Sequence, residues 1–392
     1  MVAEQSGPAW WDARLVAPPS DVDVARGFLR VLQQRYEPTA RTGPREDPLA
    51  DLKADILIRQ LADQAFVLGQ DDYARYRREA CMRLAALSIG REAREASEAL
   101  EQVLQDLLDE IVSGGEAASG SASFRMAVGF LPLAGLEVFT LEVPGEDDAY
   151  VLVMSEQIPT YVNLLAKACA QLLPIRRSGQ DVSIDLDTPA WPTRLGMEAQ
   201  GVQRFLELMF ASFGGTPSDA EQYWPDPDWQ APAEALREAG EAFLLARQFV
   251  HVALDHGGSG TVEDVFVRGE RLGARRYTRE QESDADIEAL RLLLRIPRFA
   301  DHAAITCWGV DVLLASLAML EALRARDSSD DEGRGIVTPD ETWAGERRER
   351  LREALEDMGG SRPGLVEVLT ALDPVGRALW ARLKDLVLQR DS

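Results

Sequence analysis

The histidines and a group of carboxylates are the residues of this chain best suited to bind a metal or transfer protons. Of three histidines in 392 residues, His251 and His256 stand close together near the end of an apolar segment. An acidic run that includes Glu282 and Asp286 follows them. Imidazole and carboxylate groups are common zinc ligands and general acids or bases. The i, i+5 spacing, however, predicts that the ring of His256 points well away from that of His251.

These residues also have plainer interpretations. Asp284, Asp286 and Glu288 fall near the start of a predicted helix, where carboxylates interact favourably with the helix dipole. A histidine near a helix end is usually structural, and His302 is expected to cap a helix or lie on the surface. Spacing alone therefore leaves a metal site and a solvated helix start both open.

The segment 242–256, Ala-Phe-Leu-Leu-Ala-Arg-Gln-Phe-Val-His-Val-Ala-Leu-Asp-His, resembles the zinc-binding helix of gluzincin-type metallopeptidases. That helix reads roughly A-H-E-x-x-H-V-x-L-x-H. Its histidines at i and i+4 hold zinc, and the glutamate between them is the general base. The segment 281–290 is similar to the later helix E-x-E-A-D-x-x-A, which supplies a third ligand. The resemblance places Glu282 at that ligand position and Asp286 at the acidic residue that supports it.

The resemblance covers about residues 124–357. A strand and helix around residues 150–158 look like the element that precedes the zinc helix in this family. Downstream, Thr338-Pro339 and the Arg-rich run 346–352 resemble its closing segment, where Ser/Thr-His-Pro leads into a helix. The resemblance thus implies a zincin-like metallopeptidase scaffold.

The departures from the family pattern affect the chemistry directly. Arg247 stands at the first histidine position, Gln248 at the general base and Thr338 at the closing histidine, whereas His251 and Glu282 are retained. A guanidinium group has no lone pair for zinc, and a glutamine amide cannot take a proton from water. The sequence therefore predicts a pseudoenzyme with no peptide hydrolysis, no zinc and no other cofactor.

An arginine at a former ligand position can replace the charge of the metal. We expect Arg247 to form a bidentate pair with Glu282, joined through hydrogen bonds by His251 and Gln248. The alternative is an enzyme. It would be a divergent metallopeptidase that holds zinc with His251, His256 and Glu282, or another hydrolase built around the same site. A third reading is a purely structural component of an assembly.

Apolar periodicity predicts a mainly α fold with a small antiparallel β-sheet, of the α+β class. The predicted helices are 21–36, 49–68, 71–87, 91–111, 159–173, 197–213, 233–256, 280–295, 303–326, 340–357 and 363–389. The predicted strands are 124–133, 136–143, 150–154 and 182–186.

The segment 113–123, rich in Gly, Ser and Ala, is typical of a flexible linker. It divides the chain into a helical N-terminal region (1–113), a linker (114–123) and a degenerate metallopeptidase-like domain with C-terminal helices (124–392). We expect the helical region to serve as a scaffold that packs on the second domain, with a docking surface for a partner as the alternative. The proline-broken aromatic segment Tyr223–Trp229 is expected to form a surface loop, with a partner-gripping role as the alternative.

Composition limits the classes of partner. A net charge of −24 argues against nucleic acid, because binding phosphates requires clustered Lys and Arg. It suits a solvated acidic surface first, with a protein or peptide partner that carries basic residues as the alternative. The apolar stretch 305–323 contains Asp311 and Glu321, which predicts a buried helix and no membrane span. The oligomeric state is left open.

Targeting signals and cysteine spacing bear on location. The cysteines Cys81, Cys169 and Cys307 show no paired spacing, which is typical of a reducing compartment. The first residues show no signal-peptide pattern. We therefore expect a cytoplasmic protein, and its high Ala, Arg, Asp and Glu content suits a GC-rich bacterial genome.

Overall fold

The computed structural model describes most of the chain from residue 93 onward, together with one earlier helix. The described residues are 23–36, 93–119, 124–133, 135–146, 148–173, 175–178, 181–184, 200–256, 261–267, 270–327, 337–358 and 365–390. They form two compact units. The first takes the described residues within 1–134, 138–155 and 263–274, and the second those within 135–137, 156–262 and 275–392. The helices predicted over 49–68 and 71–87 lie outside the described residues.

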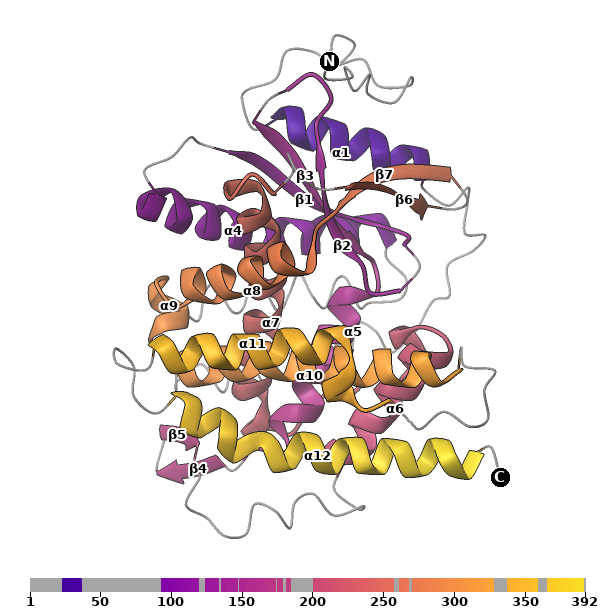
Figure 1. Ribbon diagram of the computed structural model, residues 1–392, viewed down its shortest axis with the longest axis vertical. Helices are drawn as coiled ribbons and strands as arrows, with labels where there is room; N and C mark the ends of the chain where they lie inside the picture. The colour runs from indigo at the N-terminus through magenta and orange to yellow at the C-terminus, as the bar shows by residue number, and fades with distance from the viewer. Residues whose placement is uncertain are drawn as a thin grey trace. The chain divides into compact units, whose positions relative to one another are not determined.

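The first unit contains a three-stranded sheet in the order β1-β3-β2 (Figure 1). Its strands are β1 (Arg125–Leu131), β2 (Val138–Glu142) and β3 (Ala149–Ser155). β2 and β3 form an antiparallel hairpin that turns through Gly145 at a positive φ of 83°. β3, however, pairs with β1 in parallel, so the predicted all-antiparallel sheet is wrong. Almost every residue of β1 and β3 is buried, as parallel strands tend to be.

Two helices and a strand pair complete the first unit. Helix α1 (Asp23–Tyr36) buries Phe28 and Leu32 in the core of this unit. Gly129 in β1 permits the close approach of α1, because a Cβ there would lie 2.5 Å from Leu29 Cδ2. The strands β6 (Thr261–Val267) and β7 (Glu270–Arg276), which the sequence did not predict, contribute Val267, Leu272 and Ala274 to the same core.

Helix α4 (Ala93–Ser119) is longer than predicted. It continues through Gly114 and Gly115, where the sequence indicated a linker, so that prediction is wrong for residues 114–119. The buried stripe Val103, Leu104, Leu107, Leu108 and Ile111 gives the helix enough apolar contact to extend past two glycines. Residues 120–123 lie outside the described residues.

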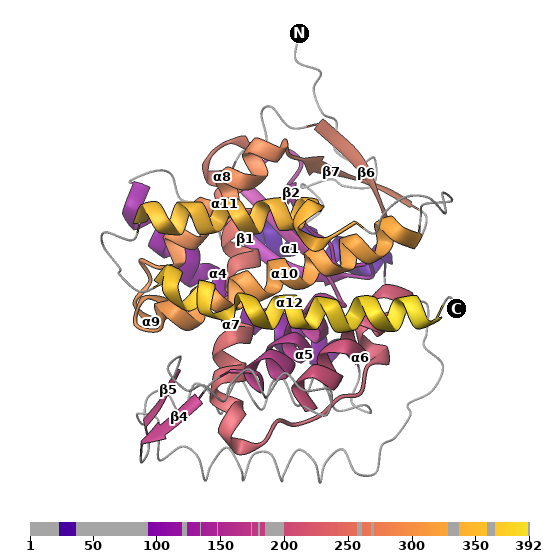
Figure 2. The ribbon, with the colours of Figure 1, turned by 60° about the horizontal axis from the view of Figure 1, so that its bottom comes forward.

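The second unit is helical and centres on α7 (Pro227–Ala253). This helix packs against α5 (Ile158–Ala170), α8 (Arg279–Leu293) and α10 (Ala303–Asp327). Figure 2 shows α7 crossing behind α10. At that crossing Gly309 lets the two backbones approach closely, because a Cβ there would lie 2.9 Å from the carbonyl oxygen of Leu236. Together the two units confirm the α+β class.

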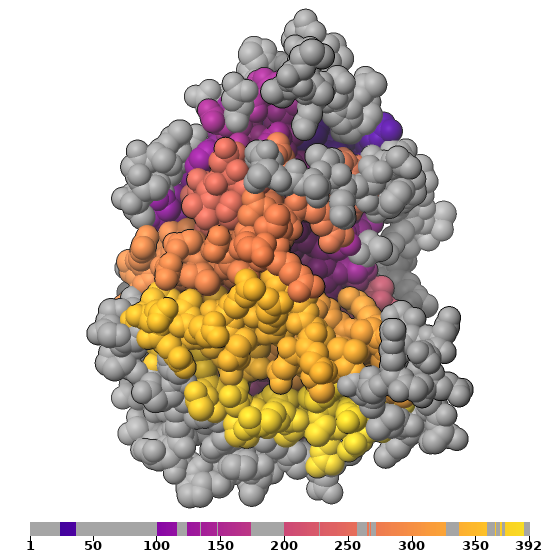
Figure 3. All heavy atoms as spheres, viewed as in Figure 1, coloured from indigo at the N-terminus to yellow at the C-terminus, as the bar shows by residue number. Residues whose placement is uncertain are grey.

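Helices α11 (Trp343–Met358) and α12 (Leu365–Arg390) pack on α10. Their side chains form one continuous surface in the space-filling view of Figure 3. The remaining elements are α6 (Gln200–Gly214), α9 (Pro297–Ala300), the paired strands β4 (Ile175–Ser178) and β5 (Asp181–Ile184), and the short turns η4 (Pro217–Asp219) and η6 (Pro339–Glu341).

Two segments singled out in the sequence have clear places in this unit. The stretch 303–326 within α10 is long and apolar enough to cross a membrane, and 72% of its most apolar window is buried inside the fold. In the aromatic segment, Tyr223 and Trp224 precede α7, which begins at Pro227 and not at residue 233 as predicted. The ammonium group of Lys167 lies 4.7 Å from the Trp224 ring centroid, while Trp224 remains 43% exposed.

Candidate functional site

The residues highlighted by the sequence lie on helices of the second unit. Arg247, Gln248 and His251 belong to α7, and Glu282 and Asp286 lie one turn apart on α8. Helix α8 starts at a capping box, in which the backbone amide of Gln281 donates to Thr278 Oγ1 and that of Thr278 donates to Gln281 Oε1. The i, i+4 spacing then points Glu282 and Asp286 in the same direction. The contacts of α8 with α7 direct both carboxylates toward Arg247.

Arg247 forms ion pairs with both carboxylates. Its guanidinium Nη2 contacts Glu282 Oε2, and its Nε lies 3.0 Å from Asp286 Oδ1. The predicted pairing of Arg247 with Glu282 is therefore confirmed. The geometry differs from the expected bidentate pair, because two neighbouring nitrogens of the guanidinium, Nη2 and Nε, contact two different carboxylates.

Arg347 of α11 adds a second guanidinium that the sequence did not predict. Its Nε and Nη2 donate to Asp286 Oδ2 and Oδ1 at 2.6 and 2.7 Å. Asp286 is only 1% exposed, so a buried carboxylate is shared by arginines from two helices. This four-residue Arg247 cluster (Arg247, Glu282, Asp286 and Arg347) joins α7, α8 and α11 and balances two positive charges with two negative ones.

Burial and neighbouring charges together shift the pKa values of both arginines in the cluster. For Arg247, desolvation and the nearby charge of Arg347 lower the pKa to about 10, against the opposing pull of Asp286. Arg247 nevertheless stays charged at neutral pH. Burial would also lower the pKa of Arg347, but the charge and hydrogen bonds of Asp286 outweigh it and raise that pKa.

The cluster does not fit a zinc ion. Arg247, which the resemblance aligns with the first histidine ligand, contacts Glu282, which the resemblance aligns with the carboxylate ligand. Gln248, at the general-base position, is 2% exposed and carries no ionisable group. Within the described ranges, no group of three or more His, Cys, Asp or Glu side chains is arranged to hold a metal.

His251 lies with His256 and Tyr277 in a second arrangement. The Nδ1 atoms of the two histidines are 2.9 Å apart, and the ring of Tyr277 stacks on His251 with centroids 3.7 Å apart. The predicted divergence of the two histidine rings is therefore wrong. Helix α7 ends at Ala253, and Asp255 adopts a φ of +50°, which turns the chain back toward His251. Gln281 holds this return through a hydrogen bond to the carbonyl oxygen of His256.

His251 is fully buried, and none of the described residues forms a hydrogen bond with its Nε2. Burial, with further contributions from the positive charges of Arg247, His256 and Arg347, lowers the pKa of His251 far below its usual value. Burial also lowers the pKa of His256. The folded protein therefore keeps His251 neutral, and the predicted hydrogen bonding of His251 to the Arg247–Glu282 pair is replaced by its contact with His256.

This neutral burial predicts a pH-dependent stability. Below the unfolded-state pKa of about 6.5, the unfolded chain binds a proton at His251 that the folded protein does not, so stability falls as pH falls. The expected loss is about 1.4 kcal/mol per pH unit, or about 2 kcal/mol between pH 6.5 and 5. Urea denaturation at a series of pH values measures it.

His251→Phe provides the matched test of this pH dependence, because it keeps the ring stacked on Tyr277 and removes the titrating group. The variant should lose most of the decline between pH 6.5 and 5. The exposed His302 supplies the control, and His302→Phe should leave the decline in place. An unchanged decline in His251→Phe would contradict the assignment.

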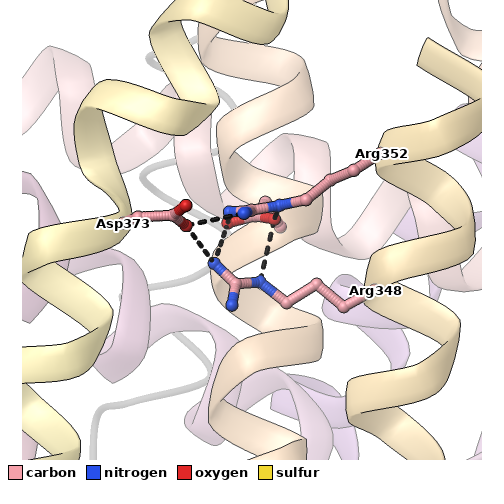
Figure 4. Close-up of polar contacts among 4 residues, drawn as sticks. Arg348, Arg352 and Asp373 are labelled. Atoms are coloured by element: carbon pink, nitrogen blue, oxygen red, sulfur yellow. Dashed lines mark hydrogen bonds and ion pairs between the residues drawn. The ribbon is translucent and has the colours of Figure 1, made fainter. Parts of the chain in front are cut away.

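A second charge cluster, the Asp311 cluster, lies among α10, α11 and α12 (Figure 4). Arg348 and Arg352 each donate two hydrogen bonds to the carboxylate of Asp311, at 2.7–3.0 Å. Both also form ion pairs with Asp373. Burial alone would raise the pKa of Asp311, but the charges and hydrogen bonds of the two arginines outweigh it and hold that pKa below its usual value.

The segment that resembles the closing segment of the metallopeptidases has structural roles in this fold. Thr338, at the position of the closing histidine, caps the turn η6, where its backbone amide donates to Glu341 Oε2 at 2.7 Å. The Arg-rich run that follows supplies Arg347, Arg348 and Arg352 to the two clusters. The sequence contained a signal for the second cluster, because Asp311 is one of only two charged residues in the apolar stretch 305–323.

No family model, no curated protein and no solved structure matches this chain.

Proposed function

We propose that this protein is a catalytically inactive, metal-free relative of gluzincin-type metallopeptidases, with a zincin-like scaffold, and that it acts by binding a peptide, a protein or a small ligand through the cleft such a scaffold provides. The observation that supports this best is the pairing of Arg247 with Glu282. A positive side chain at the first ligand position contacts the carboxylate that would otherwise bind the metal. A cytoplasmic location belongs to the same proposal.

The loss of hydrolysis follows from two positions. Zinc activates water by lowering its pKa, and a nearby base then removes the proton. Arg247 offers no lone pair to a metal, and Gln248 cannot act as the base. Restoring either position alone leaves the other half of the mechanism missing.

One observation favours a second candidate, a divergent metallopeptidase or other hydrolase with a rearranged site. His251 and His256 approach each other closely enough to act on the same ion or proton. Such a site would use Glu282 as its third ligand and would hold zinc. Glu282 would first have to leave Arg247, which would remove one of the two carboxylates that balance this buried guanidinium. The pseudoenzyme is therefore the better supported candidate.

Rebuilding the family pattern tests the proposed scaffold. The double variant Arg247→His with Gln248→Glu restores the two missing chemical groups, while His251 and Glu282 are already present. We expect the purified double variant to bind zinc at close to one ion per chain and to gain thermal stability when zinc is added, because the ion binds only the folded state. Elemental mass spectrometry and thermal denaturation measure the two effects.

Matched variants make this result specific. His251→Ala in the double-variant background should abolish zinc binding, whereas His302→Ala should not. A folded double variant that binds no zinc would contradict the zincin-like arrangement of α7 and α8, and the resemblance would then be one of sequence alone.

A further inference from the structure

The outer edge of β1 is covered by side chains from two helices of the first unit. Among the described strands, β1 pairs with β3 on one side and lies at the end of the three-stranded sheet. Backbone groups of alternate residues in a strand point to opposite sides. On the outer side, the groups of Met126, Val128 and Phe130 form hydrogen bonds to helix side chains.

The side chain of Gln105 on α4 takes the place of a peptide unit. Its Nε2 donates to the carbonyl oxygen of Met126, and its Oε1 accepts from the amide of Val128, both at 3.1 Å. Gln105 is only 4% exposed, so these bonds are shielded from water. One amide group therefore supplies the donor and the acceptor that an added strand would supply at this point.

Two further side chains form the same kind of hydrogen bonds two residues further along β1, at Phe130. Glu101 Oε1 accepts from the amide of Phe130 at 3.1 Å, and Gln33 Nε2 of α1 donates to the carbonyl oxygen of Phe130 at 3.4 Å. Gln33 also donates to Glu101 Oε1, which ties the two helices together. We call Gln33, Glu101 and Gln105 the edge cap.

The edge cap satisfies the groups through which one strand binds another. An open sheet edge is a template for an extended segment, and proteins use such edges to bind peptides by strand addition. Here the hydrogen bonds come from side chains and not from a strand backbone. Movement of α4 and α1 away from β1 would return these groups to an incoming peptide.

We propose that the outer edge of β1 accepts an extended, basic peptide segment of a partner protein, and that the edge cap keeps it closed in the free protein. Carboxylates border the edge, because Glu101 belongs to the cap and Asp109 accepts a hydrogen bond from Gln105. A net charge of −24 disfavours pairing with a second copy of the chain, whereas lysines or arginines on a peptide would meet these carboxylates favourably.

This edge belongs to the first unit and shares no residue with the Arg247 cluster. The proposal extends the binding role proposed above and does not depend on the resemblance to metallopeptidases. Zinc binding by the rebuilt variant and peptide binding by β1 are separate measurements, so either can fail without the other.

Opening the edge cap tests the proposal in the full-length protein. The opened variant is Gln33→Leu with Gln105→Leu. It lacks the hydrogen bonds to Met126, Val128 and the Phe130 carbonyl but keeps Glu101. The control is Gln34→Leu with Gln102→Leu, which changes the exposed glutamine beside Gln33 on α1 and the exposed glutamine one turn before Gln105 on α4. Each protein carries two Gln→Leu substitutions on the same two helices, and each loses a side-chain hydrogen bond to a nearby carboxylate. The hydrogen bonds to β1 are lost only in the test variant.

The probe is a fluorescent synthetic peptide with the sequence Ala-Tyr-Val-Leu-Val-Met-Ser of strand β3, with two lysines at each end. We expect it to bind the opened variant at least about tenfold more tightly than the wild type or the control, measured by fluorescence anisotropy. The same peptide with glutamates at its ends should bind more weakly. Equal affinity for the opened variant and the control would overturn the proposal.

Hydrogen exchange supplies a residue-level readout. The amides of Val128 and Phe130 should exchange slowly in the wild type, faster in the opened variant and slowly again with the lysine-flanked peptide bound. If the double substitution prevents folding, Gln105→Ala with Gln102→Ala as its control gives the same comparison. An opened variant that dimerises and ignores the peptide would assign the edge to a second copy of the chain and contradict the proposal.

Discussion

Asp286→Asn is expected to lower the free energy of unfolding by about 3–5 kcal/mol, because it leaves two buried guanidinium groups without their shared carboxylate. Asp286 is 1% exposed, and the side chains of Arg247 and Arg347 are each 11% exposed, so water screens them poorly. Asparagine keeps the shape of aspartate, and the loss therefore reports charge. Urea denaturation at neutral pH measures it.

Two companion variants show whether this loss comes from the cluster. Asp284→Asn changes the exposed neighbour on the same helix and should cost less than about 0.5 kcal/mol. Arg347→Met should cost far less in the Asp286→Asn background than in the wild type, because the charge it removes has already lost its partner. Additive effects of the two substitutions would show that Asp286 and Arg347 do not act together.

Asp311→Asn is the second large effect, with an expected loss of about 3 kcal/mol. Two arginines each bond this carboxylate at both oxygens, and it is 4% exposed. The expected loss is at the low end for a buried pair because Asp373 still balances part of the charge of Arg348 and Arg352. Asp373→Asn, at the more exposed end of the cluster, should cost about 1 kcal/mol or less.

The Asp311 cluster also predicts acid sensitivity. The pKa of Asp311 is lower in the folded protein than the value of about 3.9 in an unfolded chain. Its stabilisation is therefore complete above about pH 4 and is lost as pH falls through the folded-state pKa. Asp311→Asn should flatten the stability profile in this acidic range. An equally steep profile in the variant would show that other carboxylates control acid unfolding.

The expectation of an Arg247–Glu282 contact rests on the resemblance of segments 242–256 and 281–290 to two helices of gluzincin-type metallopeptidases, in which these positions hold ligands of one ion. Arg347 could not be placed in the same way. It lies on α11, far along the chain, and its position on Asp286 depends on the packing of α11 against α8. The Arg-rich run looks the same in sequence whether it faces solvent or a buried carboxylate.

The approach of His256 to His251 depends on one backbone angle. Helical geometry carried past Ala253 would separate the rings, whereas the positive φ of Asp255 turns the chain back and lets them approach. Aspartate and asparagine adopt this conformation more readily than most residues, which is a weak signal in a single sequence. The helices were predictable for the opposite reason, because their apolar residues recur over several turns.

The pairing of β1 with β3 illustrates a similar limit. Composition and turn residues predicted these three strands. The residues of a single strand, however, do not indicate which other strands it pairs with. β3 lies between β1 and β2, so its hairpin with β2 is local but its parallel pairing with β1 is not. The burial of both faces of these strands is consistent with either direction.

The metal content of the purified wild-type protein tests the central claim most directly. After dialysis without chelator, elemental mass spectrometry should find zinc far below one ion per chain, and His251→Ala should leave that amount unchanged. Near-stoichiometric zinc that is lost in His251→Ala would contradict the account. It would mean that His251 is a metal ligand and that Arg247 does not replace the ion.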